Sequence, residues 1–261
     1  MNARSLLALV AVAVSPAMAQ LAAPNDAGVA MGHLHLVVKD VDVQKKFWAM
    51  MGGVPVQNGQ LALIQFPGTF VMLRQGEPAG GTVGSVVNHF GFYVKDMQES
   101  LGRWKAAGVK IEQGNNPKQA FLTGPDDLRI EIFEDSSIST PIKMHHIHFN
   151  GAATAEMQAW YAKTFGAVPG KRGNFETANV PGVELAFTKA DGTLAGTKGR
   201  SLDHIGFDVQ SLDEFSKRLA SEGLKFDAPI RQVPNVKTRV AFFTDPWGTY
   251  IEVTENLAPS K

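Results

Sequence analysis

The chain has 261 residues, a formal net charge of zero and no cysteine. The lack of cysteine excludes thiol catalysis, disulfide crosslinks and thiolate-bound metal. Hydrophobic residues make up 44% of the chain and charged residues 19%, as in a folded globular protein. Because no run of Lys and Arg forms a basic patch, we expect no nucleic-acid partner.

The first 19 residues have the pattern of a cleavable export signal. Arg4 supplies positive charge, residues 6–14 are an unbroken apolar run, and the sequence Ala-Met-Ala at 17–19 offers small residues for cleavage. The apolar run is roughly half of the ~20 residues that a membrane-spanning helix needs. We therefore predict cleavage after Ala19, a periplasmic or secreted mature chain without membrane attachment, and a linker over residues 20–30.

An internal repeat organises the rest of the chain. A histidine in a strand-like segment recurs at His33, His89, His146 and His204, at steps of about 57 residues. Each segment alternates apolar and other residues, as a strand with one buried face does. The repeat therefore predicts four copies of one structural unit.

Each unit continues as a helix and further strands. Asp96 and Ser211 are placed as helix caps, each with Glu three residues later, and a glycine follows every predicted helix. Strand-like stretches fill the remainder: residues 62–66, 70–73, 120–122, 128–133, 175–178, 183–187, 238–243 and 249–254. The sequence thus predicts an α+β fold of four β-α-β-β-β units.

A polar segment at residues 136–141 separates the second and third units. It ends in proline, which is typical of a connection rather than of a strand or helix. We therefore predict two domains, residues 31–137 and residues 142–257, in each of which neighbouring units pair. A crossed arrangement, with the first unit paired to the fourth and the second to the third, stays open.

All seven histidines lie in the opening strands of the four units. The repeat-aligned histidines alternate with apolar residues, so they should face the side of the sheet that the helix does not cover. Glu131 and Glu252 alternate in the same way in the last strands of units two and four, where units one and three have Met72 and Ala186. Pairing of neighbouring units would assemble two sets: His33, His89 and Glu131, and His146, His204 and Glu252.

Each set has the composition of a metal site. Two imidazoles and one carboxylate leave coordination positions for water or substrate, as in catalytic zinc and non-haem iron sites. The alternative is that the inward histidines are hydrogen-bonded core residues. Their recurrence in register across four units favours a divalent metal (Fe, Mn, Zn or Ni), and favours it more for the second set than for the first.

A β-α-β-β-β unit that opens on an inward histidine and closes on an inward glutamate resembles the vicinal oxygen chelate superfamily. This superfamily includes glyoxalase I, bleomycin- and fosfomycin-resistance proteins and extradiol dioxygenases. The resemblance covers essentially all of the mature chain, and its most specific motif is Asp-Pro-Trp-Gly-Thr-Tyr-Ile-Glu at 245–252. It implies units paired into cupped half-barrels that hold one divalent metal, with His146, His204 and Glu252 as iron ligands if the chain is similar to extradiol dioxygenases.

Two positions depart from the extradiol pattern. Where those enzymes carry a proton-transferring His and Tyr, this chain has Asn235 and Phe242. An amide and a phenyl ring do not shuttle protons at neutral pH, so we expect weak or absent cleavage of simple catechols. Because the first half keeps its own His-His-Glu set, the chain resembles a tandem of two glyoxalase-like domains equally well.

The sequence supports two functional hypotheses. The first is an exported metal-dependent lyase, isomerase or dioxygenase that acts on a small oxygen-rich substrate. Its catalytic candidates are Glu184, His148 and Tyr250, and His35 and Arg129 are further inward residues suited to orient the substrate. The second is a protein of the bleomycin-resistance type that binds a small molecule without turnover. Both hypotheses leave the substrate open and are compatible with a homo-oligomer.

Overall fold

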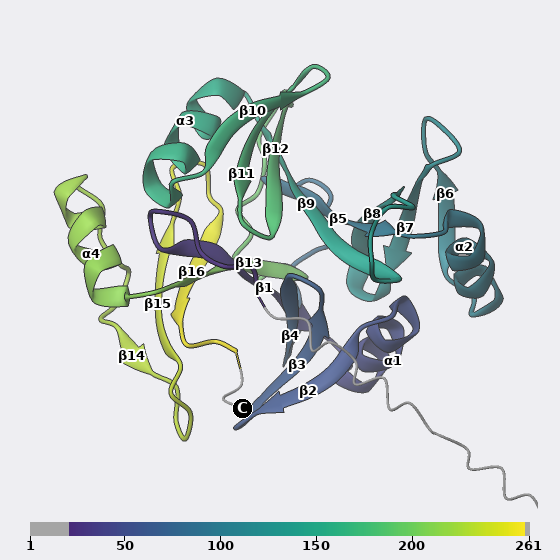
Figure 1. Cartoon of the computed structure of the whole chain (residues 1–261), viewed down its shortest axis with the longest axis horizontal. Coiled ribbons are helices and arrows are strands. Elements are labelled where there is room, and N and C mark those ends of the chain that lie inside the picture. Colours follow the sequence, from purple (N-terminus) through teal and green to yellow (C-terminus); the bar gives the residue numbers. More distant parts are fainter. Residues whose placement is uncertain (1–20, 259–261) are drawn as a thin grey trace, which may run out of the picture.

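The structure, a computed structural model, describes residues 21–258 and contains four βαβββ modules (Figure 1). Module one has β1 (Val29–Val38), α1 (Val41–Met51), β2 (Val54–Asn58), β3 (Leu61–Phe66) and β4 (Thr69–Gln75). Module two has β5 (Val87–Val94), α2 (Met97–Ala106), β6 (Lys110–Gln113), β7 (Gln119–Gly124), the 3-10 turn η1 (Pro125–Asp127) and β8 (Leu128–Glu134). Module three has β9 (Ile142–Gly151), α3 (Thr154–Phe165), β10 (Val168–Arg172), β11 (Phe175–Val180) and β12 (Val183–Lys189). Module four has β13 (Leu202–Val209), α4 (Leu212–Ser221), β14 (Arg231–Gln232), β15 (Arg239–Thr244) and β16 (Tyr250–Glu255).

The predicted export signal lies outside the described residues. Within residues 21–258, no helix is both long and apolar enough to cross a membrane.

The predicted helix caps are present. The Asp96 carboxylate accepts a hydrogen bond from the backbone N–H of Glu99 at 2.8 Å, and the Ser211 hydroxyl accepts one from the N–H of Glu214 at 3.2 Å. These side chains satisfy backbone donors that have no partner inside the helix. Gly52 ends α1 in the left-handed conformation, with φ of 108°, which a residue without Cβ adopts at little cost.

The modules pair into two eight-stranded mixed sheets. Sheet one has the order β14-β15-β16-β13-β1-β4-β3-β2, and sheet two has β10-β11-β12-β9-β5-β8-β7-β6. The central contacts are antiparallel, between β1 and β13 and between β5 and β9. The α+β class and the four βαβββ modules are therefore confirmed. The predicted pairing of neighbouring modules is wrong, because module one pairs with module four and module two with module three.

The segment predicted to separate two domains crosses a single strand instead. β8 and β9 flank β5 on its two edges. The connection lies against the end of β5, with hydrogen bonds from Asp135 N–H to the Val94 carbonyl at 2.9 Å and from Lys95 N–H to the Pro141 carbonyl at 3.0 Å. Crossing one strand spans about 10 Å, which a few residues cover. Residues 136–141 therefore join two modules of one sheet, and the units 31–137 and 142–257 do not correspond to the two sheets.

The chain changes sheet in two other connectors, residues 76–86 and 190–201. These connectors lie side by side and share a backbone bridge between Ser85 and Ala195. The N–H of Val86 donates to the Ala195 carbonyl at 2.9 Å, and the N–H of Ala195 donates to the Gly84 carbonyl at 3.0 Å. The two changes of sheet are thus hydrogen-bonded to each other.

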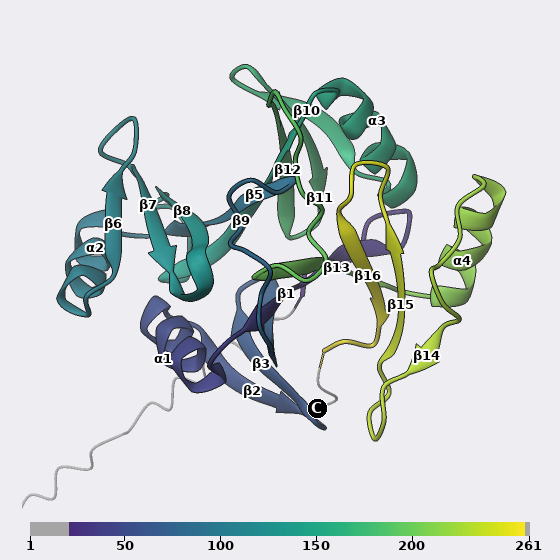
Figure 2. The ribbon, with the colours of Figure 1, turned by 180° about the vertical axis from the view of Figure 1, so that it is seen from behind.

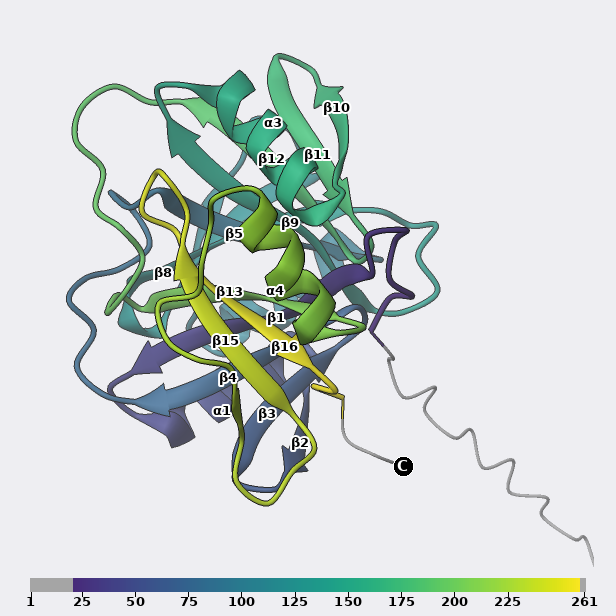
Figure 3. The same ribbon diagram turned by 90° about the vertical axis from the view of Figure 1, so that its left-hand side faces the viewer.

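The main core lies where the apolar sheet faces meet the helices. Trp48 of α1 is fully buried and contacts Phe66 of sheet one and Phe90 of sheet two. At the other end, Phe165 of α3 packs on Phe207 of sheet one, with ring centroids 4.2 Å apart. Figures 2 and 3 show β1, β13, β5 and β9 near the centre of the molecule and the helices outside them. The opposite sheet faces carry the histidines.

Candidate metal centres

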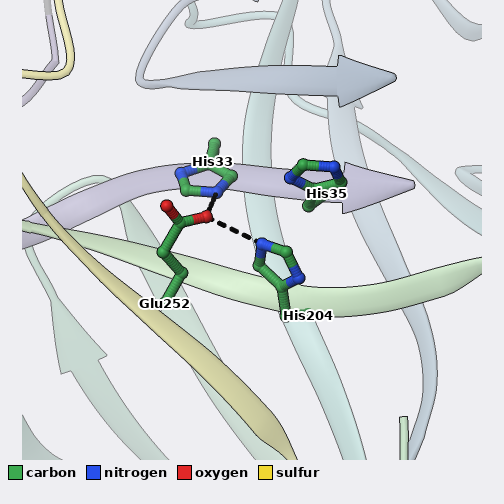
Figure 4. Close-up of side chains that lie close together, drawn as sticks. All are labelled: His33, His35, His204 and Glu252. Atoms are coloured by element: carbon green, nitrogen blue, oxygen red, sulfur yellow. Dashed lines mark hydrogen bonds and ion pairs between the residues drawn. The ribbon is translucent and has the colours of Figure 1, made fainter. Parts of the chain in front are cut away.

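Four side chains meet on the inner face of sheet one: His33, His35, His204 and Glu252, which we call site A (Figure 4). The first two histidines come from β1, His204 from β13 and Glu252 from β16. One carboxylate oxygen, Glu252 Oε2, lies 3.0 Å from His33 Nε2 and 2.8 Å from His204 Nε2. Two imidazoles and one carboxylate therefore converge with the same ring nitrogen facing inward.

Sheet two repeats the arrangement with His89, His146, His148 and Glu131, which we call site B. Glu131 Oε2 lies 3.0 Å from Nε2 of His89 and 3.0 Å from Nε2 of His146. The third histidine stacks on His89, with ring centroids 4.4 Å apart. In each site, the four ligand atoms that the residues offer lie within 4.8 Å of one another.

The six predicted ligands are thus brought together, but in other sets than pairing of neighbouring modules would give. His33 joins His204 and Glu252, and His146 joins His89 and Glu131. The register explains this exchange, because β1 pairs with β13 and β5 with β9. The sets that follow from the crossed arrangement, the alternative left open by the sequence, are the ones present.

The three catalytic candidates are divided between the sites. Glu184 pairs in register with His146, and His148 belongs to site B, whereas Tyr250 lies 5.6 Å from the His204 ring at site A. The three therefore do not surround one centre. Phe242 stands where the extradiol pattern has a proton-transferring tyrosine. It also faces site A, with its ring centroid 5.5 Å from that of His204.

A glycine beside each centre lets the ligands approach. Gly206 of β13 lies opposite His33, and Gly91 of β5 lies opposite His146. A Cβ atom on Gly206 would overlap the His33 ring, and one on Gly91 would overlap the His146 ring. Both glycines thus serve as spaces for an imidazole rather than as turns.

The ionised carboxylates of both sites and the neutral His146 suit a metal, whereas hydrogen bonds to Asp203 and Glu252 outweigh burial and raise the pKa of His204. Burial raises the pKa of the Glu252 carboxyl, but the charges and hydrogen bonds of His33 and His204 outweigh burial and hold it well below its usual range. The pKa of Glu131 is lowered in the same way by its two histidines. Burial lowers the pKa of His146 to about 3. Neutral imidazole beside ionised carboxylate is the form that binds a metal.

Unpaired ring nitrogens give a direct test of whether the residues fit a metal. Among the described residues, neither ring nitrogen of His35 has a hydrogen-bond partner, and His148 Nδ1 also lacks one. Buried polar atoms normally have partners, so such nitrogens call for an explanation. A divalent cation at each centre would accept these lone pairs, and the donor sets fit one.

Several residues near site B were not singled out from the sequence. Gln119 donates a short hydrogen bond from its amide to Glu131 Oε1 and orients that carboxylate. Arg172 donates from Nε to Glu184 Oε1 at 2.7 Å, and its guanidinium lies over Phe133 and Phe175. Both stand on strands flanking the centre, so only the register between strands could have identified them.

The two inner faces differ beside their centres. Beside site B, a cavity of about 330 Å³ is lined by Tyr93, His145 and Glu184. On sheet one, Leu257 is fully buried against Leu63, Phe70 and Met72. Sheet one also carries a cavity, of about 620 Å³, lined by Ala30, Asp208 and Lys237, so the two faces differ in the groups that line their cavities.

The comparisons with known proteins agree with this architecture. Residues 143–253 match the family model of the Glyoxalase/Bleomycin resistance protein/Dioxygenase superfamily. Glyoxalase I from Zea mays has a similar structure, with a TM-score of 0.71 at 18% identity over 87% of this chain and 92% of that one. A proposed dioxygenase from Bacillus subtilis subsp. subtilis str. 168 gives 0.66 at 15% identity, over 88% and 86%. Among curated proteins, no sequence matches the chain. Residues 143–253 therefore match the glyoxalase, bleomycin resistance protein and dioxygenase superfamily, and the described chain as a whole has the paired-module fold of glyoxalase I.

Proposed function

We propose that the protein is a divalent-metal-dependent enzyme that acts on a small oxygen-rich substrate at site B, with a second metal at site A. The observation that carries this proposal is the convergence of two histidine Nε2 atoms on one glutamate oxygen, present in both sheets. A bound divalent metal would supply a Lewis acid or a redox centre for substrate oxygens. Fe, Mn, Zn and Ni all accept such a donor set.

The polar groups beside site B support it as the substrate site. Glu184 lines this cavity and is held by Arg172. Among the described residues, Nη2 of Arg172 is buried without a hydrogen-bond partner, so it can donate to a substrate oxygen. The Thr188 hydroxyl, which faces Nε2 of His148, fixes the orientation of that ring. These groups can orient a compound with two adjacent oxygens.

Substitution of each glutamate separates the two sites. Glu131→Gln should remove the metal of site B and abolish turnover, and Glu252→Gln should remove the metal of site A alone. Glu255→Gln is the matched control, because Glu255 lies on the same strand as Glu252 but binds Arg239. Metal analysis of protein purified without added metal, oxygen uptake and isomerisation of methylglyoxal adducts are the measurements. A metal content unchanged in both variants would refute the metal centres.

Binding without turnover is the second candidate function. It is favoured by the ion pair between Arg172 and Glu184, which occupies the carboxylate that would otherwise accept a substrate proton. Under this alternative, a small polar molecule is held in the cavity and released unchanged. Retention of a tested compound by the metal-loaded protein, with no product formed over many hours, would decide for it.

We also propose that the protein is exported, on the strength of residues 1–19. Mass spectrometry of the protein from its native host should find a mature N-terminus at or near Gln20. An intact Met1 in that sample would contradict export by cleavage.

A further inference from the structure

Each of the four repeat-aligned histidines directly follows a β-bulge. The pairing register shifts by one residue at each of these points, which leaves one residue without a partner on the facing strand. These residues are Gly32 and Asp203 in the β1–β13 pair, and Asn88 and His145 in the β5–β9 pair. A bulge inserts one extra residue into a strand and redirects the side chains around it. The residue before each histidine is thus freed from the alternation that would send it to the other sheet face.

Three of these bulge residues contact the ring that follows them. Their polar atoms meet the Nδ1 atom of the next histidine, at 2.6 Å for Asp203 Oδ1 and His204, 2.9 Å for Asn88 Oδ1 and His89, and 3.0 Å for His145 Nδ1 and His146. Gly32 has no side chain, and Nδ1 of His33 has no partner in the described part of the chain. The bulge residue therefore decides what stands behind each ligand.

An acceptor behind the ring acts on the metal side of it. When Nδ1 donates its hydrogen to an oxygen, the lone pair is left on Nε2, the nitrogen that faces the glutamate in both sites. A carboxylate acceptor also adds a negative charge close to the cation, which a neutral amide or imidazole does not. Such partners fix the orientation of the ligand and increase its basicity.

The four bulge positions differ in charge. Asp203 is 5% exposed, and its other oxygen accepts from the N–H of Gly199 at 2.6 Å and lies 3.8 Å from the half-exposed Arg74. In site B, Asn88 is neutral and His145 carries no negative charge. Site A therefore has a carboxylate behind one ligand, and site B has none.

We propose that Asp203 is a positioning residue that makes site A the tighter divalent-metal site, and this inference rests on the proposed function. The third histidine does not distinguish the sites, because His35 and His148 each have a ring nitrogen without a partner among the described residues. The order of affinity is thus set by a residue behind a ligand.

A reciprocal exchange tests the proposal. Zn²⁺ and Co²⁺ are titrated against a chromophoric chelator, with site A measured in a Glu131→Gln background and site B in a Glu252→Gln background. Asp203→Asn keeps the shape and removes the charge, and it should weaken site A by about 10–100-fold. Asn88→Asp places a carboxylate behind His89 and should strengthen site B by a similar factor. The Co²⁺ absorption spectrum should change only at the altered site.

The outcomes separate the inference from the function it rests on. If the parent chain binds two metals and both exchanges leave affinity within about twofold, the role of Asp203 is wrong and the metal centres stand. If the parent chain binds none, both proposals fall. Thermal unfolding of the metal-free variants controls for a structural role. If Asp203→Asn loses affinity and also has a lower melting temperature, the loss counts against positioning. The effect of Asn88→Asp on the affinity of site B then decides whether a carboxylate behind the ligand strengthens metal binding.

Discussion

Site A and site B share one ligand trio, a third histidine and a glycine space, but they differ in the other side chains around them. The trio is set by strand register, since in both sheets one glycine pairs with the glutamate on one side and with a histidine on the other. The surroundings are set by single side chains. Leu257 covers the inner face beside site A, and Glu184 with Arg172 borders a cavity beside site B. A duplicated fold can therefore keep one ligand trio twice while changing the side chains around each copy.

The largest expected effect comes from removing one histidine ligand. His33→Ala should empty site A and leave site B filled, whereas His146→Ala should do the reverse. Losing one of three ligands should weaken binding by orders of magnitude, because even residues behind a ligand account for about 10–100-fold. The readout is the metal stoichiometry of each variant, measured in the Glu131→Gln and Glu252→Gln backgrounds.

The same pair of variants also tests the crossed arrangement. Pairing of neighbouring modules would make His146→Ala, and not His33→Ala, release the metal that Glu252 holds. That outcome would contradict the strand pairing between β1 and β13.

A pH-dependent difference should distinguish the sheets. Burial raises the pKa of Asp208 on sheet one to about 6, and nearby Glu255 adds to the increase. In the unfolded chain the carboxyl has its usual pKa of 3.8. Folding therefore favours the protonated form, and stability is gained as pH falls from about 6 toward 4. Above pH 6 the charged group costs about 3 kcal/mol, since one pKa unit corresponds to about 1.4 kcal/mol.

Asp208→Asn should remove this pH dependence. Asparagine can still accept from the Thr254 hydroxyl, which lies 2.8 Å from Asp208 Oδ1. The variant should be more stable than the parent at pH 8, and the difference should vanish near pH 4. Urea unfolding with chelator present measures it. The matching position of module two is Tyr93, so Tyr93→Phe should show no such difference; a constant offset for Asp208→Asn across the pH range would count against the raised pKa.

Filling the glycine spaces should damage one site at a time. Gly206→Ala should displace His33 and weaken the metal of site A, and Gly91→Ala should displace His146 and weaken that of site B. Each should also cost about 1–3 kcal/mol of folding free energy, as overpacked cores do. Gly102→Ala is the control, because a Cβ on Gly102, within α2, would meet nothing within 4 Å, and it should stabilise slightly. Equal metal loss from both sites in Gly206→Ala would contradict the assignment.

The smallest effect should be common to both halves. Arg200 donates from Nε to the Gly81 carbonyl at 2.9 Å and from Nη2 to the Val83 carbonyl at 3.1 Å, which ties the two connectors. Arg200→Ala should cost about 1 kcal/mol per lost hydrogen bond or less, because the site is partly exposed. Both metal affinities should stay unchanged, as titration would verify. Selective loss of one metal would mean that the connectors also shape a centre.

The modules could be predicted from the sequence because their signals are local. Alternation identified the opening strands, and the capping residues Asp96 and Ser211 marked two helix starts. The first strand after each helix was not located, since β2, β6, β10 and β14 are mostly exposed and lack an apolar face. The two-residue period of a β-strand was enough to predict that the histidines point to the inner face of the sheet.

The pairing of modules could not be predicted in the same way. It depends on contacts such as that of His33 with Glu252, which are 219 residues apart and leave no local signal. The polar segment 136–141 had the composition of a domain linker but crosses one strand. The bulge residues were missed for a related reason: alternation assigns Asp203 to the apolar face, and only a shift in register turns it to His204.

The distance along the chain between partners also sets an order of assembly. Site B joins His89 to Glu131 across 42 residues and needs only the two middle modules, whereas site A needs the first strand and the last. Contacts between distant residues form late, because closing a long loop has an entropic cost before any contact offsets it. During synthesis and folding, His33 can therefore contact Glu252 only after nearly the whole described chain is present. A metal bound at site A would join the first strand of the fold to the last, and its retention would report that folding is complete.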